Sequence, residues 1–151
     1  MATEIRGLEM GTGRSFAPSS TRRLLVVGAV LVVVATAADV ILAMALRSAL
    51  GVPAGFSPLT VPAVVTTSVV AMIGATLVFG WMARVRPDPR AAFVRIAVAA
   101  LVLSWLPDLG IWITGVFPHT TGAGILSLMA LHPVAAAFAI GILYRFGLPA
   151  R

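Results

Sequence analysis

The chain has 151 residues and a net charge of +6, and 60% of its residues are hydrophobic while only 11% are charged. A typical soluble domain is about 45–50% apolar and about 25% charged, so these few charges could not cover the apolar surface of a water-soluble fold. The basic residues also stand at the ends of apolar runs rather than in one cluster, which argues against nucleic acid as a partner.

Four apolar runs follow one another along the chain, and each is long enough for the roughly 20 residues that span a bilayer. Residues 1–20 come first; they are rich in Gly, Ser and Thr and predict a disordered cytoplasmic tail. Backbone groups in lipid must be hydrogen-bonded within their own segment, so the runs are helices rather than strands. The sequence thus predicts an all-α fold, a four-transmembrane-helix bundle over residues 21–147, followed by a short tail at 148–151. The predicted helices span residues 24–46, 62–83, 91–117 and 123–146.

Local signals mark several of the helix ends. Asp88 is a good N-cap, and Pro89 suits the first position of the third helix. Thr120 or Thr121 caps the fourth helix, and Gly147 ends it.

Charge predicts the orientation of these helices. All 11 basic residues are Arg, and all but Arg47 lie in or beside the two tails or in the 84–95 region. An excess of Arg marks the cytoplasmic side of a membrane protein. We therefore expect an N-in, C-in protein of the plasma membrane, with the lipid bilayer as its partner and both termini in the cytoplasm.

The first apolar run allows a second interpretation. Arg22-Arg23, the run that follows and Ala35-Thr36-Ala37 resemble a signal peptide with its cleavage site, and the Arg pair suggests a twin-arginine signal. The run continues past that site to about residue 46, however, which a cleaved signal does not need. We predict an uncleaved first helix, and mass spectrometry of the mature N-terminus distinguishes the two interpretations.

Three ionisable residues interrupt the apolar runs: Asp39 in the first helix, Asp108 in the third and His132 in the fourth. A charge at the centre of a bilayer costs at least about 2.5–3.5 kcal/mol, so such residues usually face the bundle interior and mark function. At about 1.5 Å per residue, all three fall about 10–14 Å below the outer helix ends. The agreement across helices of opposite direction predicts one polar layer in the outer half of the membrane.

Polar neighbours extend this predicted layer. Ser104, Asp108 and Trp112 follow one another at every fourth position and are predicted to share a helix face, and Thr36 lies one turn from Asp39. Thr66, Thr67 and Ser68 enter the second helix at a similar height. The predicted proton or ligand site therefore consists of Asp39, Asp108, His132, Ser104, Thr36 and Trp112. One aspartate would pair with protonated His132 while the other is neutral, so that the layer takes up and releases a proton near neutral pH.

Two other roles for these polar residues stay open. Polar side chains also hold membrane helices together, at about 0.6–2 kcal/mol per interaction. A metal site of Asp39, Asp108 and His132 is the weaker alternative, because no two of them share a helix at ligand spacing. There are no cysteines, which excludes disulfides, thiolate nucleophiles and zinc–thiolate sites. We expect neither a cofactor nor a bound metal.

Three segments carry a resemblance to a known family: Ala38-Asp39-Val40 with Leu50-Gly51-Val52, residues 103–108 (LSWLPD), and residues 128–132 (LMALH). In them the chain resembles an uncharacterised family of small four-helix integral membrane proteins of actinobacteria, over about residues 22–146. The resemblance implies an intact first helix. It implies no activity.

Two functions fit these observations. The first is a small proton-linked carrier or ligand-binding membrane protein, in which the polar layer binds a proton or a small polar solute. The second is a noncatalytic structural or partner-binding subunit of a membrane complex. No nucleophile–base signature is present, so we do not expect an enzyme. Four short helices often need a second copy to enclose a pathway, which favours a homo-oligomer.

Overall fold

The computed structural model describes residues 18–148, and within them the chain forms four long helices and no strand. These are α1 (Pro18–Ala49), α2 (Val61–Val85), α3 (Pro89–Thr114) and α4 (Gly122–Phe146), with one turn of 3-10 helix, η1 (Ser57–Leu59), before α2. All four long helices are long and apolar enough to cross a membrane. The prediction of an all-α fold with four membrane-spanning helices is confirmed at this level.

The helix ends differ from the predicted spans by up to six residues, and α1 and α2 end at Ala49 and Val85 rather than at residues 46 and 83. α1 begins at Pro18 rather than at residue 24, so residues 18–20 of the predicted tail are helical; the rest of that tail and residues 149–151 lie outside the described residues. α3 ends at Thr114 rather than Phe117, because Gly115 adopts a left-handed conformation (φ 59°) and its N–H donates to the Ile111 carbonyl.

Two of the predicted caps are present. The Asp88 side chain accepts a hydrogen bond from the Ala91 N–H at 3.2 Å, and Pro89 is the first residue of α3. The Thr121 hydroxyl oxygen accepts from the Gly124 N–H at 3.1 Å and so caps α4. Each side chain satisfies a backbone donor that the first turn of a helix leaves without a partner.

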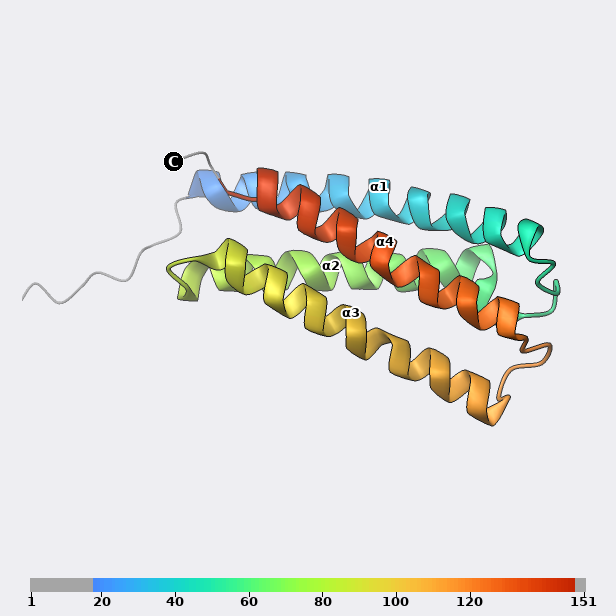
Figure 1. The fold of residues 1–151 in the computed structure, drawn as a ribbon. Helices are drawn as coiled ribbons and strands as arrows, with labels where there is room; N and C mark the ends of the chain where they lie inside the picture. The colour runs from blue at the N-terminus through green and yellow to red at the C-terminus, as the bar shows by residue number, and fades with distance from the viewer. Residues whose placement is uncertain (1–17, 149–151) are drawn as a thin grey trace, which may run out of the picture.

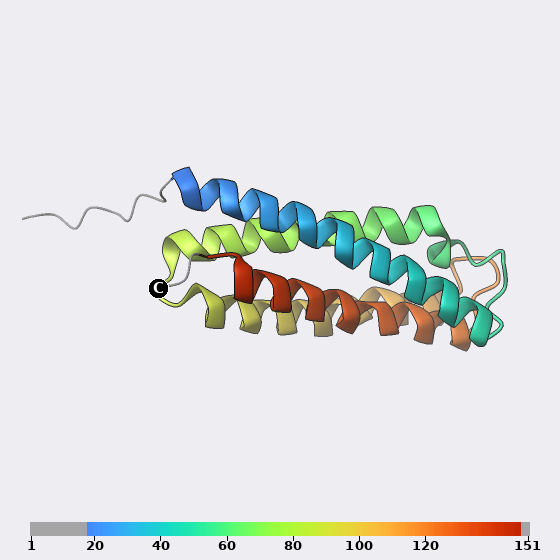
Figure 2. The ribbon, with the colours of Figure 1, turned by 90° about the horizontal axis from the view of Figure 1, so that it is seen from above.

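The four helices lie side by side with neighbours in sequence running in opposite directions (Figures 1 and 2). α4 crosses between α1 and α3 in Figure 1 and packs against both, while α2 packs against α1 and α3. The start of α1 and the end of α4 lie at one end of the bundle, together with the α2–α3 connection. The α1–α2 and α3–α4 connections lie at the opposite end, which we call the far end.

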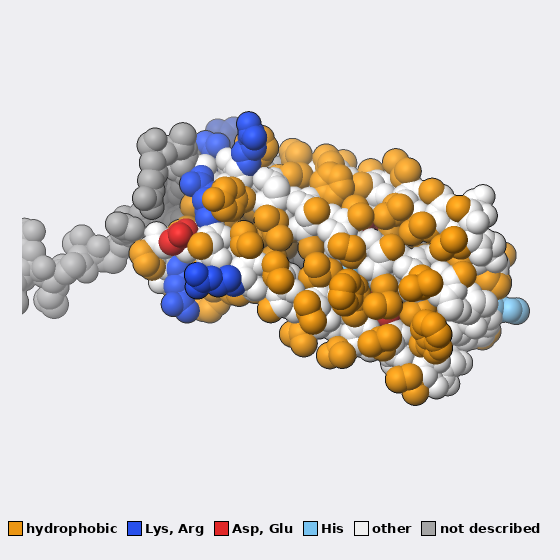
Figure 3. Space-filling view, viewed as in Figure 1, with side chains coloured by type: hydrophobic (Ala, Val, Ile, Leu, Met, Phe, Trp, Pro, Cys, Tyr) orange, Lys and Arg blue, Asp and Glu red, His pale blue; other side chains and the backbone are white. Residues whose placement is uncertain are grey.

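Charge divides the surface along the same axis. Arginine side chains gather at the end where α1 and α3 begin, whereas apolar side chains cover the body of the bundle (Figure 3). We call this the arginine end. Two of its arginines also connect helices: Arg23 Nε donates to the Phe146 carbonyl and Arg90 Nε to the Tyr144 carbonyl, each at 2.9 Å. Both carbonyls belong to the last turn of α4, so these bonds fasten α1 and α3 to it.

The apolar core consists of two separate clusters. One lies toward the arginine end, where the Phe79 and Phe93 rings meet edge to face with centroids 5.2 Å apart. The other lies toward the far end and includes Phe56 and Leu59, which the α1–α2 connection folds back onto the helices. The buried members of the first cluster are Leu24, Leu31, Ala35, Met72, Phe79, Phe93, Ala139 and Leu143; those of the second are Ala43, Val52, Phe56, Leu59, Val64, Ile125, Leu128 and Leu131.

Two glycines let α1 and α2 approach closely near the arginine end. A Cβ atom at Gly28 would lie 2.6 Å from Thr76 Cγ2, and one at Gly80 would lie 2.7 Å from Leu24 Cδ2. Small residues at such crossings are typical of membrane helix pairs. The first half of α1 and the second half of α2 are therefore in tight contact. Leu31, which precedes the candidate cleavage site, and Ala35, the first residue of that site, are fully buried parts of this core.

Candidate functional site

Asp39 faces the inside of the bundle and pairs with a serine of α2. Its side chain is only 2% exposed, and Ser68 Oγ donates to Asp39 Oδ2 at 2.7 Å. The orientation follows from helical spacing: Ala35 and Ala43, one turn before and one turn after, are both fully buried. Ser68 occupies the corresponding position on α2, between buried Val64 and Met72.

Asp108 and His132 form a second pair, between α3 and α4. Asp108 is 6% exposed, and its Oδ2 lies 3.4 Å from His132 Nδ1. The same ring nitrogen lies 2.9 Å from the Leu128 carbonyl of its own helix, where an Nδ1–H would donate. His132 is thus held in orientation by its own helix while it faces the carboxylate.

The two pairs lie between the two apolar clusters, and we call Asp39, Ser68, Asp108 and His132 the polar layer. On α1, Asp39 stands between Ala35 of one cluster and Ala43 of the other; on α2, Ser68 stands between Met72 and Val64. On α3 and α4, Asp108 and His132 supply the other pair of this layer. Among the described residues, however, no three His, Asp or Glu side chains are grouped so that they could hold a metal ion.

Three buried oxygen atoms in or beside the layer make no hydrogen bond: Thr36 Oγ1, Asp39 Oδ1 and Asp108 Oδ2. The 3.4 Å between Asp108 Oδ2 and His132 Nδ1 is an ion-pair distance, longer than a normal N–H···O bond. The large majority of buried polar atoms in proteins have a partner, and exceptions call for an explanation. A buried carboxyl oxygen that accepts no hydrogen bond is stabilised most by gaining a proton, or a hydrogen bond from a bound ligand.

A tryptophan next to the layer satisfies the carbonyl that a proline leaves open. Pro133 has no N–H, so the carbonyl of Met129, one turn earlier in α4, has no donor from its own helix. Trp105 Nε1 of α3 donates to that carbonyl at 3.1 Å. This bond joins α3 to α4 one turn away from the Asp108–His132 pair and fixes how the two helices are rotated against each other.

Two residues predicted for the site are placed differently. Trp112 is 52% exposed, and its ring lies over the start of α4 at Gly122 rather than in the layer. The Ser104 hydroxyl donates to the Leu101 carbonyl of its own helix at 2.7 Å. The physical reason is helical drift: with 3.6 residues per turn, each step of four residues turns the direction by about 40°, so positions 104, 108 and 112 diverge.

Ser68 is not among the residues predicted for the site, although it belongs to the polar run at 66–68. Thr66 and Thr67 are exposed, and Thr67 donates to the Ala63 and Val64 carbonyls of its own helix. Only Ser68 follows the buried stripe through Val64 and Met72 at every fourth position. That spacing is the signal that could have identified it.

The model of a protein family described as a family of unknown function, DUF6069, matches residues 19–147, which cover all four helices apart from Pro18. No curated protein and no solved structure matches the chain.

Proposed function

Since the chain belongs to this family of unknown function, we propose its role from its own polar layer: a small multi-pass membrane protein that binds a proton, coupled to a solute, between its helices. The observation that carries the proposal is that two buried carboxylates, Asp39 and Asp108, lie within four apolar helices, with one imidazole, that of His132, beside Asp108.

The charges of the layer do not balance by themselves. His132 supplies at most one positive charge, α2 contributes only the neutral Ser68, and two carboxylates are present. An uncompensated charge at this depth costs at least about 2.5–3.5 kcal/mol. One carboxylate therefore needs a further proton or another cation.

Asp39 is the group that we assign to this exchange. Asp108 has the ionisable His132 ring at 3.4 Å, whereas the Asp39 side chain accepts its hydrogen bond from the neutral Ser68 hydroxyl. A serine hydroxyl can accept or donate, so it can accompany both the charged and the neutral form of the carboxyl group. Asp108 and His132 then act as the fixed pair that orients the layer.

The orientation in the membrane is part of the proposal. The arginine end would face the cytoplasm by the positive-inside rule, with both termini on that side and the plasma membrane as the location. Asp39 lies nearer to the end of α1 than to its beginning, so the layer would lie in the outer half of the bilayer.

The second candidate function is a noncatalytic subunit that docks a partner helix. It is favoured by α3, whose outward side chains Leu103, Leu106 and Ile113 are between 60% and 83% exposed. Bilayer lipid covers such a surface equally well, so this observation supports the candidate less specifically than the polar layer supports proton binding.

Reconstitution into liposomes with an internal pH dye tests the proposal. We expect the wild-type protein to move protons when an effective solute gradient is applied across the membrane, and the Asp39→Asn variant to fall to the level of empty liposomes. Asn keeps an oxygen that accepts from Ser68 but cannot exchange a proton. The Asp88→Asn variant is the matched control, because Asp88 caps α3 outside the layer and its variant should keep the flux. Equal proton movement by wild type and Asp39→Asn with every solute contradicts the proposal.

A further inference from the structure

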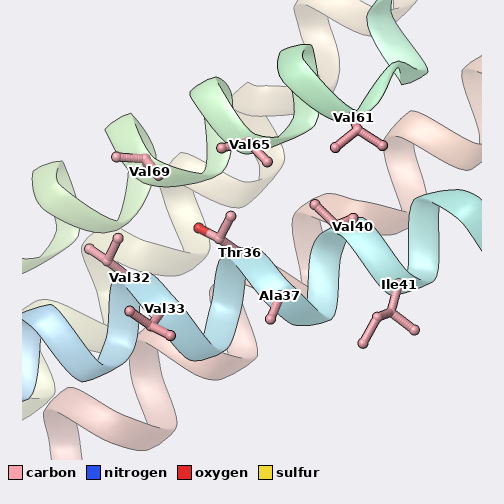
Figure 4. A pocket seen from close by; sticks show the side chains of 9 residues that line it. All are labelled: Val32, Val33, Thr36, Ala37, Val40, Ile41, Val61, Val65 and Val69. Carbon is pink, nitrogen blue, oxygen red and sulfur yellow. The ribbon is translucent and has the colours of Figure 1, made fainter.

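A groove of about 510 Å³ runs between α1 and α2 on the surface of the bundle. Val61, Val65 and Val69 point from α2 toward α1, and Val32, Thr36 and Val40 point from α1 toward α2 (Figure 4). Ala37, Val33 and Ile41 complete the lining. All of these residues belong to two helices that are long and apolar enough to span a membrane, so in a membrane the groove would open to the bilayer.

The Asp39–Ser68 hydrogen bond lies directly behind this groove. On α1, the lining residues Thr36 and Val40 stand three positions before and one position after Asp39. On α2, Val65 and Val69 stand in the same positions relative to Ser68. The bond that joins Asp39 to Ser68 is therefore flanked in the same register on both helices by residues that line the groove.

Two oxygens behind the lining of the groove are buried and have no hydrogen-bond partner. Thr36 is the only polar residue of the lining, and its buried Oγ1 has no hydrogen-bond partner. One turn farther along α1, Asp39 Oδ1 has none either. A hydrocarbon chain would give neither oxygen a hydrogen bond. A ligand with an apolar body and a charged N–H group would fill the groove and donate hydrogen bonds to these oxygens.

We propose that the groove is the entrance and binding site for a lipophilic amine, which reaches it sideways from the bilayer and places its ammonium group against Thr36 and Asp39. The inference rests on the proposed function, since the amine takes the position of the exchangeable proton on Asp39. The neutral carboxylic acid releases its proton to water, and the carboxylate left behind binds the protonated amine, so charge is conserved in the layer. The excess of acidic over basic groups in the layer, Asp39 and Asp108 against His132, is the charge complement to such a ligand.

The test compares two probes of the same shape, naphthylmethylamine and the neutral naphthylmethanol, on the full chain in phosphatidylcholine nanodiscs. Binding is followed by probe fluorescence, and proton release by a pH dye in weak buffer. We expect the amine to bind about tenfold more tightly than the alcohol, because a hydrogen bond to a charged group is worth about one factor of ten or more. Amine binding should release a proton, and alcohol binding should not.

Adjacent residues of α2 supply a matched pair of variants. Val69 lines the groove, whereas Val70 is 65% exposed outside it. Val69→Phe should fill the groove and weaken binding of both probes, while Val70→Phe should change neither. Ala37→Phe fills the same groove from α1 and serves as a second variant if Val69→Phe does not fold. Asp39→Asn should reduce the affinity for the amine to that for the alcohol and abolish proton release.

Three results would overturn the inference: equal affinity of wild type for amine and alcohol, no binding of either probe, or unchanged binding by both groove-filling variants. If any of them occurs while Asp39→Asn still loses proton movement in liposomes, the proposed function stands and only the ligand class is wrong. If Asp39→Asn moves protons as wild type does, the proposed function fails and this inference fails with it.

Discussion

Replacing His132 with leucine is expected to lower the free energy of unfolding by about 3 kcal/mol, because it removes the ion-pair partner of the buried Asp108 side chain. Asp108 is 6% exposed and has His132 Nδ1 at 3.4 Å from its Oδ2. Leucine would fill much of the space of the ring but could not stabilise the charge. Chemical denaturation of the purified protein in detergent measures the loss.

The double variant His132→Leu/Asp108→Leu distinguishes charge pairing from simple packing. Replacing both members of a buried pair with apolar residues is often neutral or stabilising, so the double variant should recover most of the lost stability. Additive losses from the two single substitutions would show that Asp108 and His132 are not energetically coupled.

Replacing Asp39 with leucine and Ser68 with alanine is expected to leave the protein at least as stable as wild type, with a gain of about 1–4 kcal/mol. Asp39 makes one hydrogen bond, to Ser68, and its Oδ1 is buried without a partner. The double substitution removes that uncompensated oxygen from the apolar core and lets the two core clusters meet at this position. Proton movement in liposomes should disappear at the same time.

The stability of this double variant distinguishes a polar layer that serves a function from one that only holds the helices together. If the Asp39–Ser68 bond serves to fasten α1 to α2, the double variant loses about 0.6–2 kcal/mol instead. Thr67→Val is the matched control, because Thr67 donates only to carbonyls of its own helix and is exposed. A stable double variant with full proton movement would contradict the role that we assign to Asp39.

The membrane-spanning helices could be predicted because their signals are local. Length and hydropathy identify the four runs, and side-chain caps such as Asp88 mark where they begin. The errors at helix ends have local causes as well. Residues 116 and 117 are apolar and extend the hydropathy run, but Gly115 has already left the helical conformation. At the start of α1, Pro18 suits the first turn of a helix, although the polar composition around it suggests a tail.

The site could be predicted only in part, because it depends on how each helix is rotated. An ionisable residue in an apolar run is visible in the sequence, which is why Asp39, Asp108 and His132 could be selected. Which of them pair is decided by helix packing: Asp39 contacts Ser68, while Asp108 contacts His132. The Trp105–Met129 bond that fixes α3 against α4 depends on contacts between helices and leaves no trace in the spacing of residues. The same holds for the groove, which exists only where α1 and α2 lie side by side.

The infrared spectrum of the carboxyl groups tests the central claim, that Asp39 exchanges a proton within the bundle, most directly. Asp39 and Asp108 are the only acidic side chains within the four helices, and a protonated carboxyl group absorbs at a different frequency from a carboxylate. We predict that purified wild-type protein in lipid shows a protonated carboxyl band that disappears as the pH is raised. This band should be absent in Asp39→Asn and unchanged in Asp88→Asn. A wild-type spectrum without an exchanging carboxyl group, or one that Asp39→Asn leaves unchanged, would contradict the claim.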